Sequence, residues 1–210
     1  DLSKQNSVKL ENIVFDWFLM HPLFVDDDGL SLESKIKHMK KLIKFSSITG
    51  FQNIIFPILE ENNINSPQKF KKCVKIFKDC ILDDLTEFNI QIHFETSLTS
   101  KIEKKLLNEL NHDKLKICFD MGNSASYGYD PENSINDIAE FLGSVHIKDR
   151  LLNGTTVPLG NGNASFDIVF SLLNQIKYNG NYILQTARSQ NGQHTQVLKE
   201  YYKFTKKFLQ

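Results

Sequence analysis

The chain has 210 residues, 40% of them hydrophobic and 24% charged, which is enough for one globular domain with a sizeable core. Its 25 basic residues balance its 25 acidic residues, so the charge does not favour nucleic acid or an anionic membrane as a partner. No apolar run approaches the ~18 residues of a membrane-spanning helix, and no signal-peptide pattern opens the chain. We therefore expect a cytoplasmic protein whose three cysteines stay reduced.

Strand-like and helix-like segments alternate along the whole chain. Apolar runs of strand length are each followed by a segment with helical periodicity. Six such pairs are expected, and in chain order their strands cover residues 11–19, 51–59, 90–95, 115–120, 144–149 and 182–187. The helices that follow them are expected at residues 30–49, 67–85, 100–110, 130–143, 165–177 and 193–209.

Helix ends carry recognisable signals. Ser66 and Pro67 suit the N-cap and the first position of the second helix. Gly50 is a natural stop for the first helix. The basic run at residues 35–44 falls within that first helix, and we expect it to form a solvated face.

Strict alternation of strands and helices predicts a parallel sheet with helical crossovers. An open doubly wound sheet fits six strands, but such sheets usually bind nucleotides through a Gly-rich loop, and the chain has neither GxGxxG nor GxxxxGK[ST]. A closed (β/α)8 TIM barrel needs two more units and typically ~250 residues. Because the chain begins with Asp1 and not with methionine, two β/α units missing from the front would reconcile it with a barrel, and both architectures stay open at this point.

Four polar side chains stand at the ends of consecutive apolar runs. Glu95 closes IQIHFE, Asp120 closes LKICFD, His146 lies in SVHIKD, and Gln185 follows NYIL. Asp120 also opens a polar, glycine-containing segment that we expect to be a loop. If the strands are parallel neighbours, all four side chains emerge at the end of the sheet where α/β folds bind ligands and metals. Two carboxylates, an imidazole and an amide at one mouth predict a site for one divalent cation.

Several of these segments resemble one known family. They are FETSL (94–98), FDMGNSASYGYDP (119–131), VHIKDR (145–150), VPLGNGNASF (157–166) and YILQTARS (182–189). They are similar to segments of the sugar phosphate isomerase/epimerase family, whose members are xylose isomerase-like TIM barrels related to ketose 3-epimerases and to hexulose- or pentulose-phosphate epimerases. The resemblance runs from Asn12 to the end of the chain and implies that the first strand here corresponds to strand three of the barrel. It therefore implies that residues 1–210 are a single TIM-barrel-like domain that lacks its first two β/α units.

The resemblance also implies a ligand set for one divalent metal ion, which could be Mn, Mg, Co or Zn. Carried over by motif, the ligands are Glu95, Asp120, His146 and Gln185. Glu95 and Gln185 occupy the two catalytic positions, which in the family's epimerases are glutamates that remove and return a proton on opposite sides of the substrate carbon. Glu95 is therefore the expected base.

Two residues depart from the family pattern. Asn123 stands where the epimerases commonly have a histidine, and an asparagine cannot relay a proton near neutral pH. Gln185 stands in place of the strand-eight glutamate; its amide oxygen can ligate a metal, but the amide cannot act as a second base. The site is also one negative charge poorer, which should lower its metal affinity. A one-base isomerase or a narrowed epimerase fits this glutamine better than a symmetric two-base epimerase.

The activity implied by the resemblance is that of a metal-dependent isomerase or epimerase, which acts on a ketose or ketose phosphate through an enediolate. Its partner would be a small-molecule sugar or sugar phosphate, and a homodimer is a further expectation. The cations at strand ends suit a phosphate group or the enediolate oxygen. The candidate substrate-binding residues are Asp16, Glu60, Asn123, Lys148, Arg150 and Arg188.

Two other functions stay open. Gln185 and the absent units also fit a degenerate barrel that binds a sugar or a metal without turnover. A phosphodiesterase-like relative, such as an abasic-site endonuclease, needs several zinc ions and many histidines, whereas only His146 of the six histidines is well placed. We therefore rank the isomerase or epimerase first and the degenerate barrel second.

Overall fold

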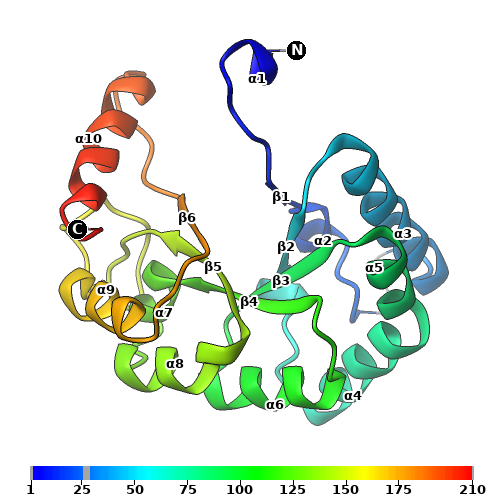
Figure 1. Ribbon diagram of the computed structural model, residues 1–210. Helices are drawn as coiled ribbons and strands as arrows, with labels where there is room; N and C mark the ends of the chain where they lie inside the picture. Colours follow the sequence, from blue (N-terminus) through cyan, green and yellow to red (C-terminus); the bar gives the residue numbers. More distant parts are fainter. Residues whose placement is uncertain (1, 26–28, 210) are drawn as a thin grey trace. The chain divides into compact units, whose positions relative to one another are not determined.

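In this computed structural model, which describes residues 2–25 and 29–209, strands and helices alternate as expected (Figure 1). The contacts within the chain divide it into two compact units. The first unit comprises the chain up to Leu98 together with Lys105–Lys116, and the second comprises Thr99–Lys104 and the chain from Ile117 onward. That residues 1–210 form a single domain stays a prediction.

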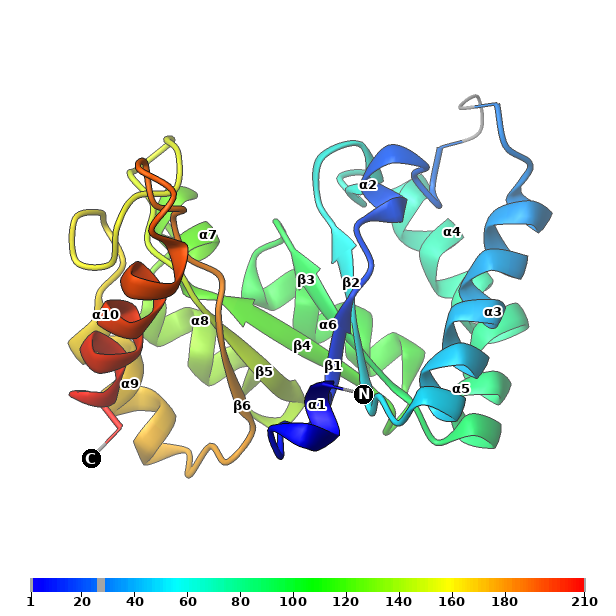
Figure 2. The same cartoon turned by 90° about the horizontal axis from the view of Figure 1, so that it is seen from above.

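The first unit is built on three parallel strands in the order β1 (Asn12–Val14), β2 (Asn53–Ile58) and β3 (Gln91–Thr96). Its helical elements are α1 (Leu2–Gln5), α2 (Trp17–Met20), α3 (Leu32–Thr49), the 3-10 helix η1 (Glu60–Asn62), α4 (Pro67–Ile76), the π-helix η2 (Phe77–Ile81) and α5 (Leu82–Phe88). Helices α3 and α5 pack side by side in both views (Figures 1 and 2). An ion pair of 3.0 Å between Lys40 and Asp84 joins these two helices.

The core of this unit lies around the two longer strands. After its first residue, every residue of β2 and of β3 is buried, as expected for parallel strands that are covered on both faces. Phe56 of β2 packs edge-on against Phe94 of β3 and against Phe77, with ring centroids 6.1 and 6.0 Å apart. Since Phe77 belongs to η2, this aromatic cluster fixes the long helical segment against the strands.

The helix ends predicted from the sequence are confirmed. Ser66 is the N-cap of α4, where its Oγ accepts a hydrogen bond from the Lys69 amide at 3.2 Å, and Pro67 follows as the first helical residue. Gly50 follows α3 in the left-handed conformation, with a φ of 89°. The π-helical turn η2 interrupts the second predicted helix, and periodicity alone does not reveal it.

The first predicted strand, residues 11–19, is wrong in its second half. The strand ends at Val14, although the Phe15 amide continues the pairing by donating to a β2 carbonyl at 3.2 Å. Asp16 then adopts helical backbone angles, and α2 begins. Asp16 therefore lies two residues beyond the strand instead of closing it.

Aromatic packing explains this early turn. Trp17 contacts the rings of His21 and His38, with ring centroids 4.5 and 4.7 Å away. Phe18 is completely buried and meets Phe56 at a centroid distance of 4.9 Å. Only a compact turn brings neighbouring side chains to these partners, so tertiary packing overrides the strand propensity of the aromatic run.

One lysine of the basic run is not solvated, contrary to expectation. Lys35 is only 1% exposed, and its ammonium donates to the carbonyls of Pro22 at 2.7 Å and Val25 at 2.8 Å. A buried charge is tolerated where hydrogen-bond acceptors replace the water that it loses. Lys35 thus ties the segment after α2 to the first turn of α3.

The second unit holds three parallel strands in the order β4 (Leu115–Asp120), β5 (Leu142–Ile147) and β6 (Asn181–Leu184), although the first two residues of β4 count with the first unit. Asp120 lies opposite His146, and His146 lies opposite Ile183. The helical elements are α7 (Met121–Ser126), α8 (Pro131–Ile138), the 3-10 helix η3 (Ala139–Phe141), α9 (Phe166–Gln175) and α10 (His194–Lys206). Helix α6 (Ser100–Leu110) contributes residues to both units.

Two expectations for this unit need correction. The segment after β4, predicted as a loop, begins with the helix α7, because Asp120 acts as its N-cap and satisfies a backbone amide of the first turn. Strands β5 and β6 end before their predicted limits, so that Lys148 and Gln185 lie just beyond them.

The last two helices lie next to each other (Figures 1 and 2), and aromatic rings join them. Phe166 of α9 meets Phe204 of α10 at a centroid distance of 5.0 Å, and Phe208 stacks on Phe170 at 5.2 Å. No helix among the described residues combines the length and the apolar character that crossing a membrane requires.

Candidate functional site

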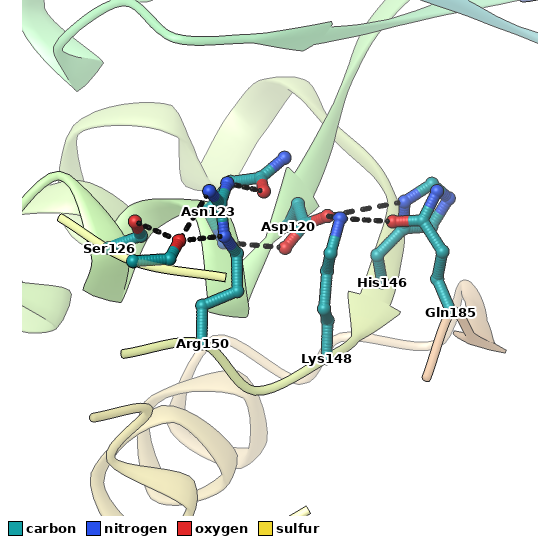
Figure 3. A network of polar contacts seen from close by, with 8 residues as sticks. Asp120, Asn123, Ser126, His146, Lys148, Arg150 and Gln185 are labelled. Carbon is teal, nitrogen blue, oxygen red and sulfur yellow. Dashed lines mark hydrogen bonds and ion pairs between the residues drawn. The ribbon is translucent and has the colours of Figure 1, made fainter. Parts of the chain in front are cut away.

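Asp120 stands at the centre of a polar network at the ends of β4, β5 and β6 (Figure 3). Its Oδ1 accepts a hydrogen bond from the backbone amide of Asn123 at 2.7 Å. Its Oδ2 lies 3.7 Å from Nδ1 of His146 and 3.2 Å from Nζ of Lys148. The parallel register places Asp120 directly opposite His146, so the two side chains leave their strands at the same level.

The surroundings of Asp120 favour its charged form. Asp120 as a whole residue is 5% exposed, and burial alone raises its pKa. The neighbouring His146 ring, the charge of Lys148 and the backbone amide of Asn123 act in the opposite direction and outweigh burial, so the pKa of Asp120 lies below its ordinary value. The site therefore holds a buried carboxylate that stays ionised.

Lys148 connects two of the predicted metal ligands. Its ammonium donates to Asp120 Oδ2 at 3.2 Å and to Gln185 Oε1 at 2.9 Å. The backbone of Gln185 is fixed as well, because its backbone amide donates to the Ile147 carbonyl at 3.1 Å and extends the β5–β6 pairing by one residue. Gly122 makes room for the lysine, since a Cβ there would come within 2.7 Å of Lys148 Cγ.

Arg150 holds α7 and the following loop together. Its Nη1 donates to Asn123 Oδ1 at 2.8 Å, while Nε and Nη2 donate to the Gly154 carbonyl at 3.1 and 2.7 Å. The guanidinium is thus engaged in a network that orients the amide of Asn123 (Figure 3). A substrate phosphate would have to compete with these hydrogen bonds for Arg150.

Asp149 is a structural residue that the sequence reasoning missed. Its side chain is completely buried, and its carboxylate accepts hydrogen bonds from the amides of Gly160, Gly162 and Ala164 at 2.9, 2.8 and 3.0 Å. Asp149 therefore shapes the loop over residues 151–164. An aspartate directly before a glycine-rich loop was the available signal, because the amides of such a loop need acceptors.

A cavity of about 900 Å³ opens beside Lys148 and Gln185. Its other walls are the segment 186–191 after β6, the loop residues 156–158, and two side chains of α10. Arg188 lines this cavity and is exposed; among the described residues it forms no hydrogen bond or ion pair. The cavity therefore offers one available cation close to the polar network.

The whole chain, and not only the site, is similar to one protein family. A family model described as "Xylose isomerase-like TIM barrel" matches residues 4–208. The chain belongs to this family. The resemblance inferred from the strand-end motifs is thereby confirmed, and so is the prediction of six β/α units of a TIM barrel.

Solved structures of the xylose isomerase-like fold match nearly the whole chain. A xylose isomerase domain protein from Planctomyces limnophilus has a TM-score of 0.83 at 21% identity, covering 99% of this chain and 80% of that one. A D-allulose 3-epimerase from Methylomonas sp. has a TM-score of 0.80 at 16% identity, with coverage of 99% and 80%. The IOLI protein with a bound zinc atom has a TM-score of 0.78 at 16% identity, with coverage of 99% and 81%. No curated protein sequence gives a significant match.

The second unit of this xylose isomerase-like chain brings most of the predicted site residues together. They are Asp120, Asn123, His146, Lys148, Arg150 and Gln185, with Arg188 on the cavity wall. The other three belong to the first unit. Glu95 lies near the end of β3 and is 3% exposed, Glu60 begins η1, and Asp16 precedes α2.

The donor atoms of the second unit suit a divalent cation. Oxygen and nitrogen ligands lie about 2.1 Å from zinc, so the 3.7 Å between Asp120 Oδ2 and His146 Nδ1 is within the span that one ion bridges. Carboxylate, imidazole and amide oxygen are all accepted by Mn, Co and Zn, whereas Mg prefers the oxygens. The residues present therefore fit the predicted group.

Proposed function

We propose that the protein is a metal-dependent isomerase or epimerase that acts on a ketose or ketose phosphate. The observation that carries the proposal is the buried pair of Asp120 and His146, a carboxylate and an imidazole at facing strand ends in a xylose isomerase-like fold. The activity of the structurally similar D-allulose 3-epimerase and the zinc atom of the similar IOLI protein support this choice of reaction and of cofactor.

We infer that one divalent ion is held by Glu95, Asp120, His146 and Gln185. Glu95 is included because it is a buried carboxylate near the end of β3, the strand that precedes β4 in the chain. When bound, the ion polarises the substrate carbonyl and the adjacent hydroxyl and stabilises negative charge on their oxygens. Mn, Mg, Co and Zn are the candidate ions.

The chain's own residues divide the remaining work. Glu95 acts as the base that removes the proton from the carbon next to the substrate carbonyl, which leads to an enediolate. Gln185 cannot return that proton, since a neutral amide has no acidic proton to give near pH 7. This difference favours an isomerase, in which the same carboxyl group carries the proton between two carbons, over an epimerase that works with two bases.

The remaining polar groups bind and orient the substrate. Asn123, oriented by Arg150, offers its amide to a hydroxyl or carbonyl group. Arg188 and Lys148 line the cavity beside Gln185 and would hold a phosphate or the far hydroxyl groups of a sugar. Asp16 and Glu60, which both belong to the first unit, are assigned to sugar hydroxyls. A cytoplasmic location and a homodimer stay predictions.

One observation favours a second candidate, a barrel that binds a sugar or a metal without turnover. The Lys148 ammonium already engages two of the predicted ligands, and Gln185 removes one catalytic carboxylate. The two candidates differ in turnover, not in binding.

The test is an assay of the purified protein, loaded in turn with each of the four ions, against a panel of ketoses and ketose phosphates in deuterated water. Incorporation of deuterium next to the carbonyl reports the proposed proton transfer even where little product accumulates. If sugar binding is saturable but no ion and no sugar of the panel gives deuterium exchange or product, the proposal of an enzyme is wrong and the second candidate, a binding protein, takes its place.

A further inference from the structure

We propose that the ammonium of Lys148 competes with the divalent ion for Asp120 and Gln185, so that the ion binds only when this lysine side chain moves away. The inference rests on the proposed function, because it concerns the regulation of the same metal site. Lys148 would then set the metal affinity of the protein, although it is not a metal ligand.

Both carboxylate oxygens of Asp120 already accept hydrogen bonds, and only Oδ2 faces His146. Oδ1 accepts from the backbone amide of Asn123 at 2.7 Å, the hydrogen bond by which Asp120 caps α7. Oδ2 faces Nδ1 of His146 at 3.7 Å, and it also accepts from Lys148 at 3.2 Å. An ion that binds between Asp120 and His146 must therefore use the oxygen that Lys148 holds.

The same lysine holds the amide oxygen of Gln185. That oxygen accepts from Lys148 Nζ at 2.9 Å, and it is the only atom of the Gln185 side chain able to ligate a metal. Two of the donors assigned to the ion are thus held by one ammonium group.

The side chain of Lys148 is largely buried and packed within this site. Its side chain is 15% exposed and crosses Gly122, where a Cβ would lie 2.9 Å from Lys148 Cβ. The neighbouring Asp149 is anchored by three loop amides, so the backbone from which the lysine projects is well fixed.

Charge repulsion determines whether the ion and the Lys148 ammonium can occupy the site together. A divalent ion about 2.1 Å from Oδ2 and an ammonium 3.2 Å from the same oxygen would lie close together in a buried site. Their repulsion is weakly screened there. A glutamate at position 185 would offset the ammonium, but Gln185 carries no charge. The cavity that Lys148 lines gives the displaced side chain a solvated position.

The experiment is a calorimetric titration of the metal-free protein with Mn²⁺ and with Zn²⁺ alone, for the wild type and for Lys148→Met. Methionine keeps an unbranched side chain, shorter than lysine by one heavy atom, and removes its charge. We expect Lys148→Met to bind the ion at least tenfold more tightly than the wild type. Lys199→Met is the matched control, since Lys199 is exposed on α10, and it should bind like the wild type.

The outcomes separate this inference from the proposed function. Equal or weaker binding by Lys148→Met, next to a wild type that binds, overturns the competition and leaves the metal site intact. If Lys148→Met binds the ion and the wild type does not, the competition is supported, and the wild type is then a protein that does not use the ion. Absence of binding in both proteins overturns the metal site and the competition together.

A measurement on the wild type covers the case in which Lys148→Met does not fold. Reductive methylation followed by mass spectrometry compares the labelling of Lys148 with that of Lys199, with and without Mn²⁺. The ion should raise the labelling of Lys148 several-fold, because the displaced amine enters the solvated cavity, and should leave Lys199 unchanged. Unchanged labelling of Lys148 at saturating ion contradicts the displacement.

Discussion

Gly162 lies so close to Asp149 that no side chain fits between them. Its amide donates to Asp149 Oδ2 at 2.8 Å, and a Cβ at position 162 would collide with the Oδ1 atom of the same carboxylate. The contact therefore needs both a glycine at position 162 and a carboxylate at position 149. This hydrogen bond fixes the loop over residues 151–164 beside Lys148 and Arg150.

Asp149→Asn should lower the free energy of unfolding by about 2 kcal/mol or more, because an amide NH₂ would then face a loop N–H and leave a buried donor unsatisfied. Denaturation by urea, followed by circular dichroism, measures the difference. Asp167→Asn, at an exposed position of α9, is the matched control and should change stability by a few tenths of a kcal/mol only. Equal effects of the two substitutions would show that the loop does not depend on Asp149.

Glu95→Gln should reduce turnover by roughly 10³-fold or more, since it removes the proposed base while keeping the size of the side chain. The measurement is kcat for the best substrate of the sugar panel, together with deuterium exchange next to the carbonyl. Circular dichroism and thermal melting serve as controls for folding. Unchanged turnover in a folded Glu95→Gln protein would remove Glu95 from the mechanism.

Gln185→Glu should be tolerated and should raise metal affinity, because it restores a carboxylate beside Asp120 and His146. It also pairs with Lys148, so the gain should be larger in the double variant Gln185→Glu/Lys148→Met than in Gln185→Glu alone. Titration calorimetry with Mn²⁺ measures both differences. Weaker binding by Gln185→Glu than by the wild type would exclude residue 185 as a ligand.

The stability contributed by Asp120 should depend on pH. Its pKa is lowered in the folded protein, so the folded state gains stability above the ordinary value of 3.8 and loses it as the pH falls through the folded value. In the presence of a chelator, Asp120→Asn should therefore unfold more easily than the wild type at pH 7, and the difference should shrink toward pH 3. A difference that stays constant over this range would mean that the charge of Asp120 contributes nothing to stability.

The sequence predicts much of this molecule, and particular residues show why. Apolar runs and helix signals such as Ser66–Pro67 are local, so the six strand–helix pairs follow from the chain itself. Asp120 and His146 meet because parallel strands align their ends, which the alternation already implies. Residues 15–19 do not follow the strand pattern, because one ring partner of Trp17, His38, comes from the next long helix, α3.

The finer chemistry of the site depends on contacts that no motif encodes. The direction of Lys148 follows from the space above Gly122 and from the position of Gln185, which lies 37 residues further along the chain. Arg150 looks like a cation for a phosphate in the sequence, but loop closure brings the Gly154 carbonyl to its guanidinium. Long polar side chains have many accessible directions, and only the folded surroundings select one.

The hydrogen bonds of Arg150 have a consequence for protein engineering. Arg150 joins Asn123 of α7 to Gly154, and the Asn153 amide donates to the Ser126 carbonyl at 2.8 Å at the other end of the same helix. A loop transplanted from a relative into residues 151–164 would therefore also reset the angle of the Asn123 amide. Loop libraries meant to change sugar preference should keep Gly154 constant, because a Cβ there would come within 2.8 Å of Leu151 Cβ and would force a shift next to the carbonyl that Arg150 binds.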